Sequence, residues 1–316
     1  MVVTCTARKK AVVPAVLKMS RIRGTSLPVR FHHWSRNLER YAGIRTKALD
    51  LYCGNAWSVV RRIAASEEMG ARVRLWIVSA GLGLVTPQRS VPPYSATFSR
   101  RERDSVLRDG DQESLQAWWE LLVAWRRSER SAVGSIADIA RRHPHEPLVA
   151  ALSSDYFAAL REDLLEARGL LHNPSSLVII SAGANKGGEL AQSFLPCDSR
   201  LEHEFGRGRM ALNARVLEAF LNQHLVEGRT IRRVREHYGK MLDALPASNY
   251  PLRKRSSDDQ VRRFIRARLA EDPRCTHTRL LRAYRDKGLA CEQSRFRGLF
   301  REVAGALICG EDGRSV

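Results

Sequence analysis

An apolar run at residues 75–78 stops on Ser79, and Gly81 and Gly83 follow it closely. Such a run is typical of a parallel strand that is buried on both faces. Glycine lets the backbone take positive φ and pass close to a ligand, and three prolines stiffen the chain that leads on to Tyr94. Because open α/β sheets bind ligands at the carboxyl ends of their parallel strands, this segment predicts a binding loop.

The same Ser-Ala-Gly ending returns at Ser181 and Gly183, after a second apolar run at residues 177–180. We expect two neighbouring strands that deliver both loops to one crevice at the carboxyl edge of the sheet. The second loop continues with Asn185 and Lys186, whose side chains are hydrogen-bond donors.

A third unit of strand and polar loop begins the chain. Residues 2–6 are β-branched or small and include Cys5 and Thr6, and a basic turn with Lys9 follows. From residue 1 to residue 47 the sequence has eleven Lys and Arg against one acid, with three aromatic residues between them. This mixture suits a nucleic-acid backbone and its bases, and it equally suits a solvated basic face over ordinary core aromatics.

The formal net charge of the 316 residues is +19, and 44% of them are hydrophobic. A charge this large in a chain of ordinary apolar content points to a polyanionic partner, with DNA as the first candidate. The length allows a full α/β core and a second, smaller domain. No feature of the sequence requires a protein partner.

The sequence has no apolar run of 18 or more residues, and its first residues lack the apolar core of a secretory signal. We therefore expect a cytoplasmic protein with no membrane segment. The six cysteines are scattered without a C-x-x-C pair, and the histidine pairs have no partner at metal spacing. This pattern predicts reduced thiols, no metal site and no cofactor.

The elements that must position these loops form an α/β domain over residues 1–245, in which a small parallel sheet is flanked by helices. Residues 100–171 carry helical patterning and are expected to form a helical insertion. An irregular stretch from residue 195 to residue 213 contains Asp198, and long polar loops in compact domains tend to be functional.

The composition changes after a linker at residues 246–255. Residues 256–309 predict an all-α module of three short helices, which resembles the helix-turn-helix plan with a basic third helix. Between residues 253 and 303 there are fifteen basic against seven acidic residues, so we expect this module to contact DNA. The candidate contacts are Arg253, Lys254, Arg255, Arg295, Arg297 and Arg301.

Three motifs in order carry a resemblance to a known family: V-V-T-C-T-x-x-K, then A-L-D-L-Y-x-G, then I-V-S-A-x-x-G-L-x-x-P followed by P-Y-S-A-T-F. Over residues 2–98 the chain resembles a bacterial family related to the uracil-DNA-glycosylase superfamily and to the glycosylase-like domain of archaeosine synthases. The chain has neither the G-x-D-P-Y nor the H-P-S-P loop of true uracil-DNA glycosylases, so the target base stays open. The residues that carry the resemblance are Cys5, Lys9, Asp50, Tyr52, Gly54, Ser79, Ala80, Gly81, Gly83, Leu84, Pro87, Pro92 and Tyr94.

The resemblance implies a uracil-DNA-glycosylase-like fold and cleavage of the N-glycosidic bond of a base flipped out of double-stranded DNA. Its target would be a modified base, such as glucosylated hydroxymethylcytosine in phage DNA, and its effect antiviral defence. The reaction needs a carboxylate or amide that orients water and donors near the departing base. The catalytic candidates are Asp50, Asn185 and Asp198, with Glu189 as a further carboxylate. The expected substrate contacts are Cys5, Thr6, Lys9, Tyr52, Ser79, Gly81, Gly83, Tyr94, Ser181, Gly183 and Lys186.

Two other interpretations remain open. The likeness to archaeosine synthases also suits an enzyme that modifies or exchanges a base in tRNA, which would leave no abasic product. A DNA-binding regulator with a small ligand in the crevice is the third possibility, because no catalytic dyad stands out in the sequence.

Overall fold

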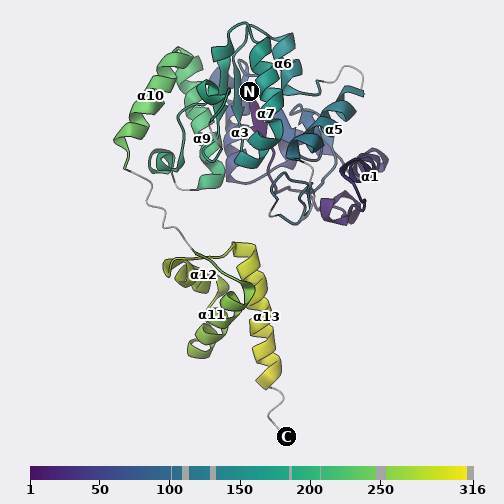
Figure 1. Ribbon diagram of the computed structural model, residues 1–316, viewed down its shortest axis with the longest axis vertical. Helices are drawn as coiled ribbons and strands as arrows, with labels where there is room; N and C mark the ends of the chain where they lie inside the picture. The colour runs from purple at the N-terminus through teal and green to yellow at the C-terminus, as the bar shows by residue number, and fades with distance from the viewer. Residues whose placement is uncertain are drawn as a thin grey trace. The chain divides into compact units, whose positions relative to one another are not determined.

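The computed structural model describes residues 1–100, 102–108, 114–128, 133–184, 187–206, 208–246 and 254–311. The chain divides into two compact units, Met1–Ala247 and Ser248–Val316, and each has a hydrophobic core of its own (Figure 1). None of the helices in these ranges is both long and apolar enough to cross a lipid bilayer.

The first unit is a mixed α/β structure around a five-stranded sheet with the strand order β4-β3-β1-β6-β7. β1, β3, β6 and β7 run parallel, and β4 joins the edge antiparallel to β3. The predicted α/β class is therefore confirmed at this coarse level. The strands are β1 (Val2–Thr4), β3 (Trp76–Ser79), β4 (Gly83–Val85), β6 (Leu148–Ala151) and β7 (Leu177–Ile180).

All of β6 and β7 is buried, as expected for short runs of aliphatic residues in parallel strands that are covered on both faces. A separate antiparallel ladder joins β2 (Thr46–Lys47) to β5 (Ser90–Val91). This ladder brings the segment after residue 47 beside the segment after residue 91.

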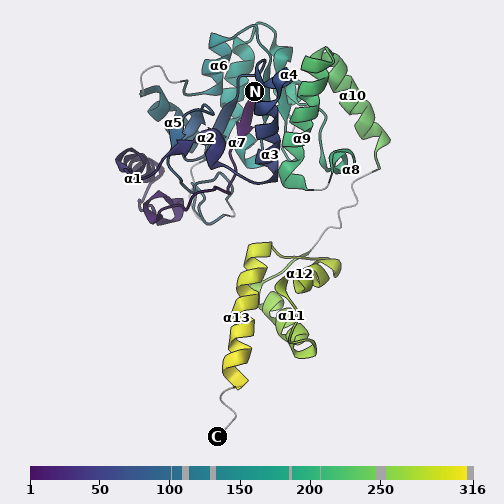
Figure 2. The same ribbon diagram turned by 180° about the vertical axis from the view of Figure 1, so that it is seen from behind.

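Helices cover both faces of the sheet. The crossover from β1 to β3 and the crossover from β6 to β7 run in opposite directions across the sheet, so right-handed connections place α3 and α7 on opposite faces. α9 packs against α3, while α5 and α6 pack against α7. Figures 1 and 2 view the unit from these two sides.

The longer helices of the first unit are α1 (Leu27–Arg40), α3 (Asn55–Ala65), α5 (Leu115–Ser128), α6 (Ile136–Arg142), α7 (Ser154–Leu170), α9 (Arg209–Leu221) and α10 (Ile231–Ala244). The short helices are α2 (Ala48–Leu51), α4 (Glu67–Gly70) and α8 (Glu202–Phe205). Single turns of 3-10 or π type lie at Ala15–Leu17, Met19–Arg21, Pro174–Ser176, Ala191–Ser193, Ser199–Leu201 and Asn222–Val226.

Two expectations about the sheet were wrong. The strands that end in Ser-Ala-Gly, β3 and β7, are not neighbours, because β1 and β6 lie between them. Residues 100–171 are not a helical insertion, because they contain β6, which pairs with both β1 and β7. The run that forms β6 is short and rich in alanine, so it reads equally well as part of a helix.

The second unit consists of α11 (Asp258–Glu271), α12 (His277–Asp286) and α13 (Gln293–Glu311), with a two-residue parallel ladder between β8 (Lys254–Arg255) and β9 (Leu289–Ala290). A capping box starts α11, since the side chains of Ser257 and Gln260 bond to each other's backbone N–H. The side chain of Thr276 caps α12. One apolar core joins the three helices.

Candidate functional site

Five buried side chains meet at the carboxyl ends of β1 and β3. The hydroxyl oxygens of Tyr52 and Tyr94 lie 2.6 Å apart, and Ser79 Oγ also hydrogen bonds to the Tyr94 hydroxyl. Cys5 Sγ lies 3.3 Å from the hydroxyl of Tyr156 and 3.7 Å from that of Tyr94. We call these five residues the tyrosine cluster. They come from four separate stretches of the chain, so the fold must assemble them.

Burial sets the electrostatics of the tyrosine cluster. Removal from water raises the pKa of Tyr52, Tyr94 and Tyr156 well above the ordinary value, and the neighbouring Cys5 raises it further. The three phenols are therefore neutral at pH 7. Neutral hydroxyls both donate and accept, so the network is self-satisfied without a charged group inside it.

Lys9 lies at the border of the tyrosine cluster. Its Nζ is 4.6 Å from the ring centroid of Tyr94 and 5.8 Å from that of Tyr52, which is cation–π geometry. The same nitrogen donates to the carbonyl of Ala7 at 3.3 Å. Burial lowers the pKa of Lys9, although nearby Cys5 and other groups partly oppose this. An amine in this setting gives up its proton more easily than a surface lysine does.

Backbone pairing explains why the first two sequence motifs lie together. The N–H of Lys10 donates to the carbonyl of Leu51 at 2.9 Å, and the N–H of Cys53 donates to the carbonyl of Arg8 at 3.1 Å. Thr6 Oγ1 donates to the carbonyl of Cys53 at 2.9 Å, which ties the end of β1 to the same segment. Thr6 thus holds the loops together, and its oxygen lies 3.0 Å from a second carbonyl, that of Arg8.

The first Ser-Ala-Gly loop is a tight hairpin turn between β3 and β4. Ser79 Oγ accepts the N–H groups of Gly81 at 3.1 Å and Leu82 at 3.0 Å. Gly83 has a φ of +72°, where side chains are strained. A Cβ on Gly81 would lie 2.6 Å from the ring of Tyr94, so this glycine admits the tyrosine ring. The ring of Tyr94, and not a ligand, therefore makes the close approach to the backbone of Gly81.

Two buried tryptophans hold this turn. The indole N–H of Trp34 donates to the carbonyl of Gly81, and that of Trp118 donates to the carbonyl of Ala80, both at 2.7 Å. Buried indoles usually find such a partner, and these two fix the shape of the turn.

The second Ser-Ala-Gly loop forms a separate group with the end of β6. Asn213 accepts the N–H of Ala182 at 3.0 Å and donates to the carbonyl of Leu152 at 2.7 Å, so it clamps the two strand ends together. Ser181 is fully buried, and its hydroxyl has no partner among the described residues. Gly183 is exposed, and Ser154 is its nearest neighbour. Asn185 and Lys186 lie outside the described residues.

The tyrosine cluster and the second Ser-Ala-Gly loop lie at the same edge of the sheet, and Tyr156 links them. This residue lies in the first turn of α7, directly after β6, and its hydroxyl contacts Cys5 at the end of the neighbouring β1. The point between β1 and β6 is where the strand order reverses, which is the usual ligand position in open α/β sheets. If residues 148–151 are predicted as a strand, Tyr156 falls at the carboxyl edge of the sheet. The helical pattern of the sequence alone does not indicate this position.

The candidate carboxylates have different surroundings. Asp50 lies on α2, its side chain is 45% exposed, and its Oδ1 is 3.4 Å from Arg61 Nη2. Asp198 accepts the N–H of Arg200 at 2.8 Å and pairs with the guanidinium of the same residue, so it shapes its own loop. Glu189 is exposed. Asp50 is thus the candidate that is both open to water and close in sequence to Tyr52.

The candidate DNA contacts of the second unit fall into two kinds. Arg297 and Arg301 are exposed one turn apart on α13, and neither forms an ion pair within the described part of the chain. Arg295 donates to Asp258 at 2.7 Å and to the carbonyl of Ser256 at 3.0 Å, so it braces the start of α11. Lys254 is exposed, Arg253 lies outside the described residues, and the side chain of Arg255 is not described.

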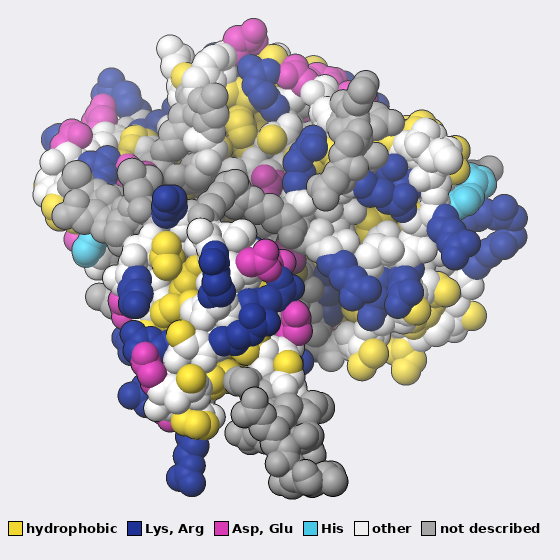
Figure 3. Space-filling model, turned by 60° about the horizontal axis from the view of Figure 1, so that its bottom comes forward, with side chains coloured by type: hydrophobic (Ala, Val, Ile, Leu, Met, Phe, Trp, Pro, Cys, Tyr) yellow, Lys and Arg dark blue, Asp and Glu magenta, His cyan; other side chains and the backbone are white. Residues whose placement is uncertain are grey.

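Figure 3 shows exposed Lys and Arg side chains at many positions, with acidic and hydrophobic side chains between them. Within the described residues, no three His, Cys, Asp or Glu side chains come close enough to hold a metal ion. Cys5, Cys53, Cys197, Cys275 and Cys291 form no disulfide.

Comparison with known proteins finds no matching family model, no matching curated protein and no matching solved structure.

Proposed function

We propose that the protein is a DNA glycosylase that hydrolyses the N-glycosidic bond of a modified base and leaves an abasic site. The observation that carries the proposal is the position of Lys9 at the border of the tyrosine cluster, where the loops after β1 and β3 meet. This is the carboxyl edge of a parallel sheet, at which such folds bind ligands. The motif resemblance to the uracil-DNA-glycosylase superfamily supports the same activity.

In the proposed reaction, water adds to C1′ of the sugar and the base leaves with the electron pair of the C1′–N bond. Negative charge therefore develops on the base, and a cation held in a poorly solvated place stabilises it strongly. Lys9 supplies that cation in our proposal. Because the rings of Tyr52 and Tyr94 hold its ammonium group, little reorganisation is needed when the charge develops.

Asp50 is the proposed group that orients the attacking water. Its carboxylate is half-exposed and can accept a proton from water, and Arg61 Nη2 lies 3.4 Å from its Oδ1. The strand-like pairing of residues 8–10 with residues 51–53 brings its segment beside that of Lys9. The proposal therefore assigns the departing base to Lys9 and the sugar face to Asp50.

The second unit is proposed to hold the DNA. Three helices around a small core, with a basic last helix, suit a helix-turn-helix module whose final helix enters the major groove. Arg297 and Arg301 are exposed cations of that helix. Between residues 253 and 303 the sequence contains fifteen basic and seven acidic residues. A glycosylase needs such an anchor, because flipping a base costs a few kcal/mol of lost stacking and pairing.

The test is to incubate the full chain with duplex DNA that contains glucosylated hydroxymethylcytosine and with unmodified DNA. Abasic sites are then detected by alkaline cleavage. We expect abasic sites in the modified DNA, and Asp50→Asn should lower the rate of their formation by about 100-fold. Glu236→Gln, on a 56% exposed carboxylate of α10 outside the proposed DNA-binding unit, should leave that rate unchanged. Absence of abasic sites from both DNAs would contradict the proposal, and base exchange in tRNA without such sites would favour a base-modifying enzyme instead.

A further inference from the structure

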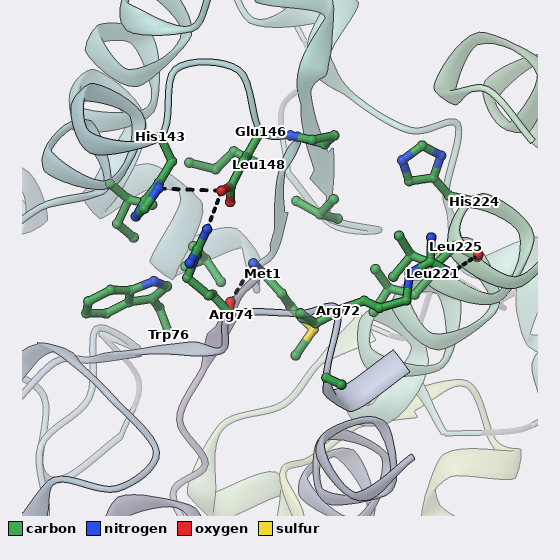
Figure 4. Close-up of a pocket in the computed structure, with 16 residues that line it drawn as sticks. Met1, Arg72, Arg74, Trp76, His143, Glu146, Leu148, Leu221, His224 and Leu225 are labelled. Atoms are coloured by element: carbon green, nitrogen blue, oxygen red, sulfur yellow. Dashed lines mark hydrogen bonds and ion pairs between the residues drawn. The ribbon is translucent and has the colours of Figure 1, made fainter. Parts of the chain in front are cut away.

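A cavity of about 340 Å³ lies at the amino-terminal edge of the sheet, at the opposite ends of the strands from the tyrosine cluster (Figure 4). It is bounded by the starts of β1, β3 and β6 and by the end of α9. Its size falls at the lower end of the range of small-molecule sites. Neither the proposed reaction nor the DNA-binding module uses it.

One wall of the cavity carries a chain of polar contacts. Arg74 forms an ion pair with Glu146, and His143 Nδ1 lies 3.5 Å from the same carboxylate. Figure 4 shows these three side chains turned toward one another, with Trp76 beside Arg74. The indole N–H of Trp76 is shielded from solvent and has no acceptor among the described residues.

The facing wall carries Arg72 and His224. Arg72 Nη1 donates to the carbonyl of Leu225, which fixes the guanidinium at the rim and leaves its other N–H groups available. His224 Nδ1 lies 2.8 Å from the carbonyl of Arg229, so this nitrogen carries the proton and Nε2 is an acceptor in the neutral ring. Apolar side chains line the walls between these polar side chains.

The charges and shapes of the lining define a class of ligand. The lining contains two guanidinium groups, from Arg72 and Arg74, but one carboxylate, from Glu146. The cavity therefore favours an anion. Guanidinium groups match phosphate geometry, and an indole offers a flat face to a base. We propose that this cavity is a binding site for a 5′-mononucleotide, with the phosphate at the arginines and the base against Trp76.

The experiment measures binding to the full chain by isothermal titration calorimetry, with 5′-AMP, adenosine and inorganic phosphate as separate probes. We expect 5′-AMP to bind at least about tenfold more tightly than either fragment, because it alone engages both the arginines and Trp76. Arg74→Met and Arg72→Met should each weaken 5′-AMP by about tenfold or more and leave adenosine unchanged. Trp76→Ala, which removes the ring, should weaken 5′-AMP and adenosine alike.

Arg232→Met is the matched control, since Arg232 is 85% exposed on α10 and does not line the cavity. Its binding should equal that of the unaltered chain, and thermal unfolding should show that all four variants fold. The proposal fails if 5′-AMP does not bind, if phosphate alone binds as tightly, or if the cavity variants bind like the control. No DNA is present, so the outcome is independent of glycosylase activity.

Discussion

The hydroxyl oxygens of Tyr52 and Tyr94 lie 2.6 Å apart in the interior, although 42 positions separate the two residues in the sequence. The ladder between β2 and β5 makes this contact possible, because it pairs Thr46 with Val91 and Lys47 with Ser90 shortly before each tyrosine. The two sequence motifs that contain these tyrosines are therefore parts of one structural unit. That unit closes the carboxyl edge of the sheet around Ser79.

Tyr94→Phe tests the tyrosine cluster, because the Tyr94 hydroxyl is the partner of both Tyr52 and Ser79. Its removal leaves buried polar groups with fewer partners, and we expect a loss of about 1–3 kcal/mol in the free energy of unfolding. Urea denaturation measures this loss. Tyr41→Phe is the control, since the Tyr41 hydroxyl has no hydrogen bond within the described residues, and equal effects of the two changes would contradict the interpretation.

The two Ser-Ala-Gly loops should respond differently to a change of their glycine to alanine. A Cβ on Gly81 would lie 2.6 Å from the ring of Tyr94 and 2.9 Å from Trp34, so Gly81→Ala should destabilise the protein by about 1–3 kcal/mol. A Cβ on Gly183 would lie 3.8 Å from Ser154, an ordinary contact, so Gly183→Ala should change stability by less than about 0.5 kcal/mol. Melting temperatures of the two variants would decide, and similar shifts would refute the distinction.

The sequence predicts those parts of the fold that local patterns determine. Apolar runs reveal β3 and β7, and capping residues such as Ser257 and Thr276 mark helix starts, because each pattern acts within a few residues. Strand order is not local. It depends on which strands pack together, so the separation of β3 from β7 by β1 and β6 could not be read from the repeated tripeptide.

The same reason limits the prediction of the site. The sequence motifs contain Cys5, Lys9, Tyr52, Ser79 and Tyr94, and the structure brings all five together. The partners that complete the edge, Tyr156 and Asn213, have no motif around them and become visible only once β6 is known to lie beside β1 and β7.

Asp138 gives a pH-dependent prediction for stability. Burial raises the pKa of this carboxyl, but Arg127 and the N–H groups of Gly134 and Ser135 outweigh burial and hold the pKa at about 2. The folded state thus binds fewer protons than the unfolded state between about pH 4 and pH 2, and stability is lost as the pH falls through that window. Asp138→Asn should cost about 1–2 kcal/mol at pH 7 and much less at pH 2. Urea unfolding at both pH values measures this, and a difference that does not shrink would contradict it.

Lys9→Met tests the proposed cation near the base. We expect it to lower the rate of abasic-site formation by about 100-fold, because a positioned charge is lost. Burial lowers the pKa of Lys9, so the unfolded state binds more protons between that lowered pKa and the ordinary 10.5. The stability of the unaltered chain should therefore rise relative to Lys9→Met as the pH increases through this window. Lys10→Met, on an exposed neighbour, should change neither quantity.

Arg297 and Arg301 make the last prediction, which concerns DNA affinity. If their exposed guanidinium groups neutralise phosphates, Arg297→Ala and Arg301→Ala should each change the slope of log K for DNA binding against log salt. We expect each variant to make this slope less steep by about one. Arg295→Ala should differ, because Arg295 is already bonded to Asp258 and Ser256. It should lower the unfolding temperature of the second unit and leave the salt slope unchanged at temperatures where that unit is folded. Fluorescence anisotropy of labelled DNA at several salt concentrations separates the two roles, and a slope that responds equally to all three changes would show that Arg295 leaves Asp258 to bind phosphate.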